Sequence, residues 1–273
     1  MARMNATPLD QKVIVVVGGT TGLGLSGAAA CVSAGARVVV VGRDANHVAE
    51  AERSLGDAAR SLVGDAKEPD TARRAVKLAV EAFGRLDGLY HVAGGSGRKQ
   101  GDGPLAAISD DGWDYTLRLN LTSLFYSNRA AIEQFLAQGS PGAILNMGSV
   151  LGFSPAPNYF ATHAYAAAKA AIEGLSRSAA AYYAPHDIRI NVITPALVET
   201  PMSQRAVGDE AILRYVESKQ PLDGGRVGQP SDLDAAVVYF LSDQSRFVTG
   251  QTLAVDGGWS VTEGQECKRQ NEE

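Results

Sequence analysis

The chain has 273 residues, of which 45% are hydrophobic and 20% charged, with 30 glycines and a formal net charge of −5. This composition suits one large α/β domain or two small ones, and the acidic balance argues against a nucleic-acid-binding surface. Its apolar runs are too short to span a bilayer, and its first eleven residues lack the apolar core of a secretory signal. Its two cysteines, Cys31 and Cys267, indicate no disulfide framework. We therefore expect a soluble cytoplasmic enzyme with neither nucleic-acid nor membrane partners.

Short β-branched runs alternate with helix-like segments along the whole chain. We predict strands at Val13–Val17, Arg37–Val41, Ser61–Val63, Gly88–Val92, Ala143–Met147, Ile188–Ile193 and Thr252–Val255. We predict helices at Leu25–Ala34, from Asp44 onward, and at Asp70–Phe83, Asp114–Leu136, Ala161–Ala184 and Ser231–Leu241. This alternation predicts a doubly wound, Rossmann-type parallel sheet of seven strands with helices on both faces.

No shift in composition marks a second domain. We expect one domain over residues 11–262, with an N-terminal extension over residues 1–10 and a polar tail over residues 263–273. Two stretches, Gly94–Ser109 and Ala196–Pro230, escape the alternating pattern. In folds of this class, long irregular loops lie at the carboxyl ends of the strands, where ligands bind.

A glycine-rich turn follows the first strand and leads directly into a helix. Its spacing is Gly18, Gly22 and Gly24, within Gly18-Gly19-Thr20-Thr21-Gly22-Leu23-Gly24. Glycines at such a turn let the backbone approach a pyrophosphate at the positive end of the helix. An ordinary βα turn is the alternative, but the position in the first βα unit favours dinucleotide binding by Gly18, Thr20, Thr21, Gly22, Leu23 and Gly24.

The end of the second strand bears on which dinucleotide binds. An acidic residue there would bind the adenosine ribose hydroxyls, whereas Arg43 offers a guanidinium suited to a 2′-phosphate. Asp44 could accept from the ribose, but we expect it to cap the next helix. The sequence therefore favours NADP(H), with NAD(H) as the alternative.

Tyr165 and Lys169 lie four residues apart in an alanine-rich segment, Tyr165-Ala166-Ala167-Ala168-Lys169. Residues four apart share one face of a helix. An ammonium close to a phenol favours the phenolate and should lower the pKa of the phenol. The pair is therefore a candidate proton donor and acceptor for alcohols and ketones, although the same spacing also occurs by chance in helices.

Together these features resemble the short-chain dehydrogenase/reductase family, from about Gln11 to Trp259. Tyr165 and Lys169 match the catalytic pair of the family, Ser149 its catalytic serine and Asn120 the asparagine of its proton relay. The C-terminal segments Phe247–Gln251 and Val255–Gly258 match a further motif. The resemblance also implies cofactor contacts by Tyr165 and Lys169 and by Asp65, Ala66, Ala93, Gly94, Pro195, Val198 and Thr200.

The chain departs from the family pattern at three places, of which one is Pro195-Ala196 in place of the usual Pro-Gly. The usual Asn-Asn-Ala-Gly after the fourth strand is His91-Val92-Ala93-Gly94, so the side-chain bonds of its first two positions are lost or changed. The stretch between Ser149 and Tyr165 is longer than usual, which we interpret as an extended rim loop. Aromatic residues in and near it, with Met202, could line an apolar substrate site or simply pack together; they are Phe153, Tyr159, Phe160 and Tyr215.

The resemblance implies an oxidoreductase that interconverts a secondary alcohol and a ketone, similar to the 3-oxoacyl-carrier-protein-reductase-like members and assembled as a dimer or tetramer. Two alternatives remain: an NAD-dependent dehydrogenase of a sugar, steroid or ring diol, and a non-catalytic dinucleotide-binding scaffold. A serine hydrolase using Ser149 and His163 is disfavoured because the sequence around Ser149 lacks the G-x-S-x-G turn. No histidine pair has metal-ligand spacing, so we expect no metal site.

Overall fold

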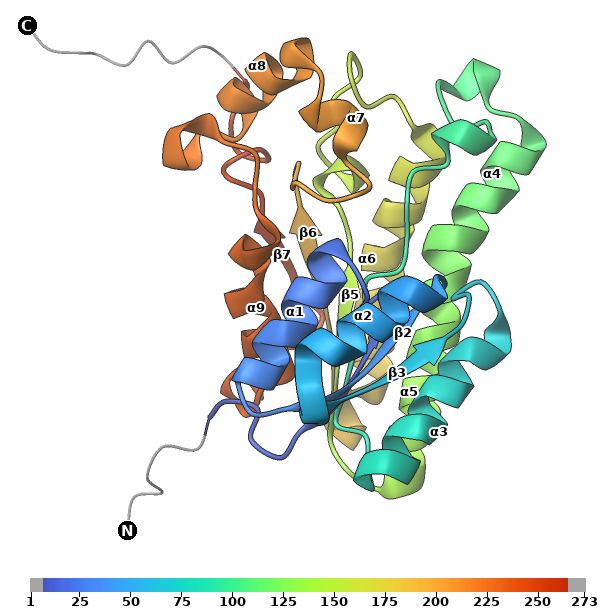
Figure 1. Cartoon of the computed structure of the whole chain (residues 1–273). Helices are drawn as coiled ribbons and strands as arrows, with labels where there is room; N and C mark the ends of the chain where they lie inside the picture. The colour runs from blue at the N-terminus through green and yellow to red at the C-terminus, as the bar shows by residue number, and fades with distance from the viewer. Residues whose placement is uncertain (1–6, 265–273) are drawn as a thin grey trace, which may run out of the picture.

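A computed structural model describes residues 7–264 and shows one parallel sheet (Figure 1). The strands run in the order β3-β2-β1-β4-β5-β6-β7 and every pairing is parallel. Their bounds are β1 Val13–Val17, β2 Arg37–Gly42, β3 Ala59–Val63, β4 Gly88–His91, β5 Gly142–Met147, β6 Ile188–Pro195 and β7 Thr252–Val255. The predicted doubly wound sheet of seven strands is confirmed.

Helices cover both faces of this sheet (Figure 1). One face carries α1 Gly22–Ser33, α2 Ala45–Leu55 and α9 Asp234–Leu241, and the other carries α3 Pro69–Phe83, α5 Ser123–Gln138 and α6 His163–Tyr183. Side chains alternate between the faces along a strand. In β1, Ile14 and Val16 therefore enter one core cluster, while Val13, Val15 and Val17 enter the other.

The long helix expected over Asp114–Leu136 differs from the prediction in its bounds and its regularity. It begins as α4, Asp110–Leu117, because the Ser109 hydroxyl accepts a hydrogen bond from the backbone N–H of Gly112 at 3.0 Å. A π-helical segment, Arg118–Thr122, then separates α4 from α5. Such bulges are frequent at functional sites, and this one contains Asn120.

The stretch Ala196–Pro230, expected to be irregular, contains two helices. They are α7 Gln204–Val207 and α8 Glu210–Lys219, and both lie beyond the carboxyl ends of the strands (Figure 1). Asp209 caps α8 by accepting from the N–H groups of Ala211 and Ile212. The buried pair Ile212 and Val216, four residues apart, was the available signal for this helix.

The expected extension is in part attached to the domain. Leu9 is fully buried in a core cluster, and its N–H donates to the Ala34 carbonyl at 2.9 Å. Residues 1–6 and 265–273, which include Cys267 and most of the expected tail, lie outside the described residues. In the described range 7–264, no helix combines the length and apolarity needed to cross a membrane.

Candidate functional site

A cavity of about 1060 Å³ opens at the carboxyl ends of the strands. It brings together the glycine turn, the ends of β2 to β6 and the first turns of α6. All predicted site residues except Gly24 and Asn120 line it: Gly18, Thr20, Thr21, Gly22, Leu23, Arg43, Asp65, Ala66, Ala93, Gly94, Ser149, Tyr165, Lys169, Pro195, Val198 and Thr200. Residues spread over more than 180 positions thus face one continuous space.

The glycine turn leaves the N-terminus of α1 open to a ligand. Gly18 has a φ of 85°, and a Cβ there would lie 2.6 Å from the backbone nitrogen of Ala93. Thr21 precedes α1 without a side-chain cap, and the first turn holds no acidic residue. The free N–H groups of this 12-residue helix can therefore bind an anion such as a pyrophosphate.

Gly24, although outside the cavity wall, is required by the same turn. A Cβ at this position would lie 1.9 Å from the carbonyl oxygen of Gly18. Its predicted role in cofactor binding is thus exerted through close packing of α1 against the turn. The glycine cradle and the uncapped helix fit a dinucleotide.

The end of β2 separates the roles of Arg43 and Asp44. The Asp44 carboxylate accepts from the N–H groups of Asn46 and His47 at 2.9 and 3.0 Å, and these bonds, His47 first, lower its pKa. Asp44 is therefore the N-cap of α2, as predicted. In the part of the chain that the structure describes, the Arg43 side chain is exposed and has no hydrogen bond or ion pair.

Ser149, Tyr165 and Lys169 meet at the inner end of the cavity. Ser149 follows β5, whereas Tyr165 and Lys169 lie one turn apart on α6, 9% and 3% exposed. The Lys169 Nζ lies 2.8 Å from the Met147 carbonyl oxygen, to which it donates, and 5.5 Å from the centre of the Tyr165 ring. The sheet and one helix thus bring an ammonium, a phenol and a hydroxyl to one place.

The pKa of the Tyr165 phenol differs in direction from the sequence-based expectation. Burial raises it to about 12, opposed by a hydrogen bond with Ser149. Burial also lowers the pKa of Lys169 to about 7. Removal from water disfavours the charged form of each group. Burial therefore favours the protonated phenol of Tyr165 and the neutral amine of Lys169.

Asn120 lies behind this site, fully buried in the π-helical segment. Its Oδ1 accepts from the Gly95 N–H at 3.0 Å, and its Nδ2 donates to the carbonyls of Gly95 and Thr116 at 3.0 and 2.9 Å. Both ends of the amide are thus occupied in holding the chain after β4. The proton-relay role that the resemblance implies for Asn120 would therefore have to use its backbone instead of its side chain.

His91 replaces the first asparagine of the family pattern and makes its own bonds. Its Nδ1 lies 2.9 Å from the Ser127 Oγ, and its Nε2 lies 3.0 Å from the Ala93 carbonyl oxygen. Burial, together with the charge of Lys169, lowers the pKa of His91 to about 3. A neutral imidazole therefore fixes Ala93, and the changed bonds expected at this position are found.

Asp102 is a functional candidate that the sequence did not reveal. Its buried carboxylate accepts from the N–H groups of Ala164 at 3.0 Å and Tyr165 at 3.1 Å. Thr162, which precedes α6, makes no side-chain cap of its own. The stretch between β4 and α4 thus supplies the cap of the helix that carries Tyr165 and Lys169. The only sequence signal for Asp102 was its negative charge within the glycine-rich stretch Gly94–Ser109.

His163 also ties this stretch to α6, because its Nδ1 accepts from the Leu105 N–H at 2.9 Å. It is engaged with the backbone and does not line the cavity, so it is available neither to Ser149 as a base nor to the cavity as a wall residue. Of the expected apolar lining, Phe160 and Met202 face the cavity, whereas Tyr159 and Tyr215 pack on each other at 5.0 Å between ring centres. Trp259, which was not predicted, is a buried part of the wall.

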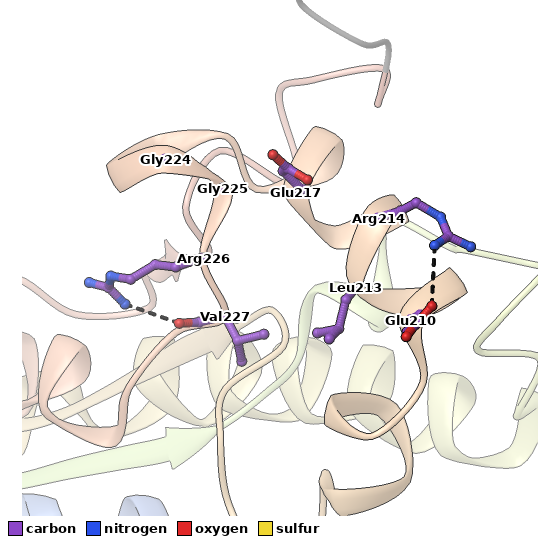
Figure 2. Close-up of a pocket in the computed structure, with 8 residues that line it drawn as sticks. All are labelled: Glu210, Leu213, Arg214, Glu217, Gly224, Gly225, Arg226 and Val227. Atoms are coloured by element: carbon purple, nitrogen blue, oxygen red, sulfur yellow. Dashed lines mark hydrogen bonds and ion pairs between the residues drawn. The ribbon is translucent and has the colours of Figure 1, made fainter.

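A second, smaller cavity of about 360 Å³ lies between α8 and Gly224–Val227 (Figure 2). Three of its four charged lining residues are engaged, because Arg214 pairs with Glu210 at 3.7 Å and Arg226 donates to the Val227 carbonyl at 3.2 Å; Glu217 makes no hydrogen bond or ion pair within residues 7–264. None of the predicted site residues lines it. Among residues 7–264, no cluster of three or more His, Cys, Asp or Glu residues could hold a metal ion.

Comparison with known proteins places this geometry in context. A family model described as enoyl-(acyl carrier protein) reductase matches residues 17–260. The 2-dehydro-3-deoxy-D-gluconate 5-dehydrogenase of Escherichia coli is 34% identical over 94% of this chain and 98% of its own length. The NADP-dependent (R)-specific alcohol dehydrogenase of Lentilactobacillus kefiri is 33% identical over 93% of this chain and 98% of its own length.

Solved structures show the same similarity. The 3-ketoacyl-(acyl-carrier-protein) reductase of Brucella melitensis, complexed with NADH, superposes with a TM-score of 0.81. It is 27% identical in sequence, and the match covers 93% of this chain and 100% of that chain.

Proposed function

Because the chain belongs to the short-chain dehydrogenase/reductase family, we propose that its cavity interconverts a secondary alcohol and a ketone with a nicotinamide dinucleotide. One observation carries the proposal. The glycine turn at the N-terminus of α1 and the Ser149, Tyr165 and Lys169 side chains face the same cavity. A dinucleotide lying along it would bring its reactive ring to the proton-transfer group. When bound, the cofactor supplies or accepts the hydride.

The side chains at the inner end of the cavity transfer the proton and stabilise the charge on the substrate oxygen. Tyr165, whose phenol stays protonated at neutral pH, donates its proton to the carbonyl oxygen during reduction and takes it back during oxidation. Ser149 donates a hydrogen bond to the same oxygen and stabilises its developing negative charge. Lys169, with a pKa of about 7, can return a proton to the phenol from one helical turn away. Asn120 acts as a positioning residue by holding Gly95.

NADP(H) is the proposed preference because Arg43 is free to pair with a 2′-phosphate while Asp44 is engaged with α2. Arg43→Asp should lower the ratio of kcat/KM for NADPH to that for NADH by about tenfold or more, because a charge-assisted hydrogen bond is lost and repulsion replaces it. Arg53→Asp, at an exposed arginine in the last turn of α2, is the matched control. An unchanged ratio in Arg43→Asp would overturn the preference.

The catalytic proposal is tested by following absorbance at 340 nm with a panel of ketones and alcohols and with both cofactors. Tyr165→Phe should reduce turnover by about 100-fold or more while leaving cofactor affinity intact, since the proton donor alone is removed. Tyr182→Phe, at an exposed tyrosine of the same helix, should have no effect. A non-catalytic scaffold would bind the cofactor and turn over nothing, and full activity in Tyr165→Phe would refute the mechanism.

A homo-oligomer is the proposed assembly, built on the outer faces of α5 and α6. Large apolar side chains are exposed there, namely Phe125, Leu136, Leu175 and Tyr182. Their grouping on neighbouring helices supports a contact between copies of the chain.

A further inference from the structure

Two arginines from separate loops meet on the substrate side of the cavity. Arg98 lies between β4 and α4, and Arg205 lies on α7. The Nη2 of each donates to the same acceptor, the Tyr159 carbonyl oxygen, at 3.2 and 3.3 Å. Both side chains line the cavity. Two cations are thus held within hydrogen-bond distance of one oxygen atom.

Within the described range of residues, neither guanidinium forms an ion pair with a carboxylate. Burial and the charge of Arg205 lower the pKa of Arg98, and the charge of Asp102 opposes them. The Asp102 oxygens, however, bond to the first turn of α6 and to neither arginine. The arrangement therefore keeps two like charges together, with the charge of Asp102 offsetting them only in part.

The charged lining differs between the two ends of the cavity. The adenosine end has charges of both signs, since Asp44 and Asp65, which follow β2 and β3, line it together with Arg43. On the substrate side the charged lining residues are Arg98, Lys99 and Arg205. A chain of net charge −5 thus presents a positive surface where the substrate must enter.

The position of the pair places it beside the substrate. The Arg205 Cζ lies 6.0 Å from the centre of the Phe160 ring, which also lines the cavity, and Tyr159 and Phe160 lie in the loop between Ser149 and Tyr165. Arg43, the cation proposed for the cofactor phosphate, lies at the opposite end. We infer that Arg98 and Arg205 bind an oxyanion, a carboxylate or a phosphate, on the alcohol or ketone substrate. This inference rests on the proposed function, and it follows from the preference of guanidinium groups for such oxyanions.

The first test measures binding without turnover. The full-length protein, with and without NADP⁺, is titrated calorimetrically with hexanoate, hexyl phosphate and hexan-1-ol. At least one anion should bind about tenfold or more tightly than the alcohol, as expected for charge-assisted hydrogen bonds. The probe that binds more tightly than the alcohol, hexanoate or hexyl phosphate, shows whether the site prefers a carboxylate or a phosphate. The Arg98→Gln/Arg205→Gln double variant should lose the preference for the anion. The Arg98→Lys/Arg205→Lys double variant should retain part of that preference. The control variant Arg53→Gln should retain all of it. Equal binding of all three probes, or a preference that survives the Gln double variant, would overturn the inference.

The second test separates this inference from the proposed function. Oxoacids from 3-oxobutanoate to 6-oxoheptanoate are compared with their methyl esters, and dihydroxyacetone phosphate with dihydroxyacetone. The anionic member of a pair should have the higher kcat/KM, through a lower KM, and only that member should lose activity in the Gln double variant. If esters and acids are reduced equally, the inference fails and the oxidoreductase stands. If no ketone is reduced but the anion preference in binding holds, the oxyanion site at Arg98 and Arg205 stands and the proposed reaction fails.

Discussion

Replacing Asp102 with alanine should destabilise the protein and slow turnover, although this residue does not line the cavity. The substitution removes the acceptor for two buried N–H groups at the start of α6. Loss of a helix cap costs about 0.5–2 kcal/mol, and each buried donor left without a partner costs about 1–3 kcal/mol. Because partial relaxation limits the sum, we expect the free energy of unfolding to fall by about 2–4 kcal/mol. Asp102→Asn, which keeps one acceptor oxygen, should lose about half as much.

The matched control is Asp209→Ala, because Asp209 also accepts from two N–H groups at a helix start but is exposed. Water can replace its bonds, so the expected loss is about 1 kcal/mol or less. Urea denaturation measures the stability, and steady-state kinetics measures the effect on the site. In Asp102→Ala, kcat should fall while the cofactor dissociation constant stays unchanged, since the glycine turn is not disturbed. If Asp102→Ala loses no more stability than Asp209→Ala, or if its kcat is that of the wild type, the positioning role is wrong.

Two further predictions concern Lys169 and the assembly. Burial lowers the pKa of Lys169 from 10.5 to about 7. Between pH 7 and 10.5 the unfolded chain therefore binds one proton more than the folded chain. The free energy of unfolding should then rise with pH by up to about 1.4 kcal/mol per pH unit. Lys169→Met should lack this rise in urea titrations at pH 7 to 9 without cofactor, and identical pH dependence in both proteins would contradict the burial of a titrating lysine. Light scattering at micromolar concentration should show a dimer or tetramer. Leu175→Glu on α6 should weaken this assembly. A monomeric wild-type protein would refute the proposed contact.

The sequence predicted central strands such as β1 well because their β-branched runs are buried on both faces. Val13–Val17 was predicted with the bounds that β1 has in the structure. The glycine turn was predictable because it follows the first strand of a doubly wound sheet, whereas cavity residues such as Asp65 and Val198 were named only through the resemblance to the family. Asp44 was predictable as a cap because its partners, Asn46 and His47, follow it within three residues.

What the sequence did not reveal depends on contacts between distant segments. Asp102 bonds to residues more than 60 positions away, and no local pattern encodes that partnership. The direction of the Tyr165 pKa was missed because spacing along a helix reports a neighbouring charge but not the loss of water around both groups. The bonds of the Asn120 amide were also not predictable, because its partner Gly95 lies 25 positions earlier in the chain.

Trp259, which lies near the end of the sequence, forms part of the cavity wall. Trp259 is buried against Phe160 and Tyr215, with ring centres 6.0 and 5.6 Å apart, and its Nε1 donates to the Ser154 carbonyl. During synthesis from the N-terminus, the nucleotide-facing turn can form long before this indole leaves the ribosome. A nascent or truncated chain ending before Trp259 would therefore have a coenzyme groove without a closed chamber for the second reactant.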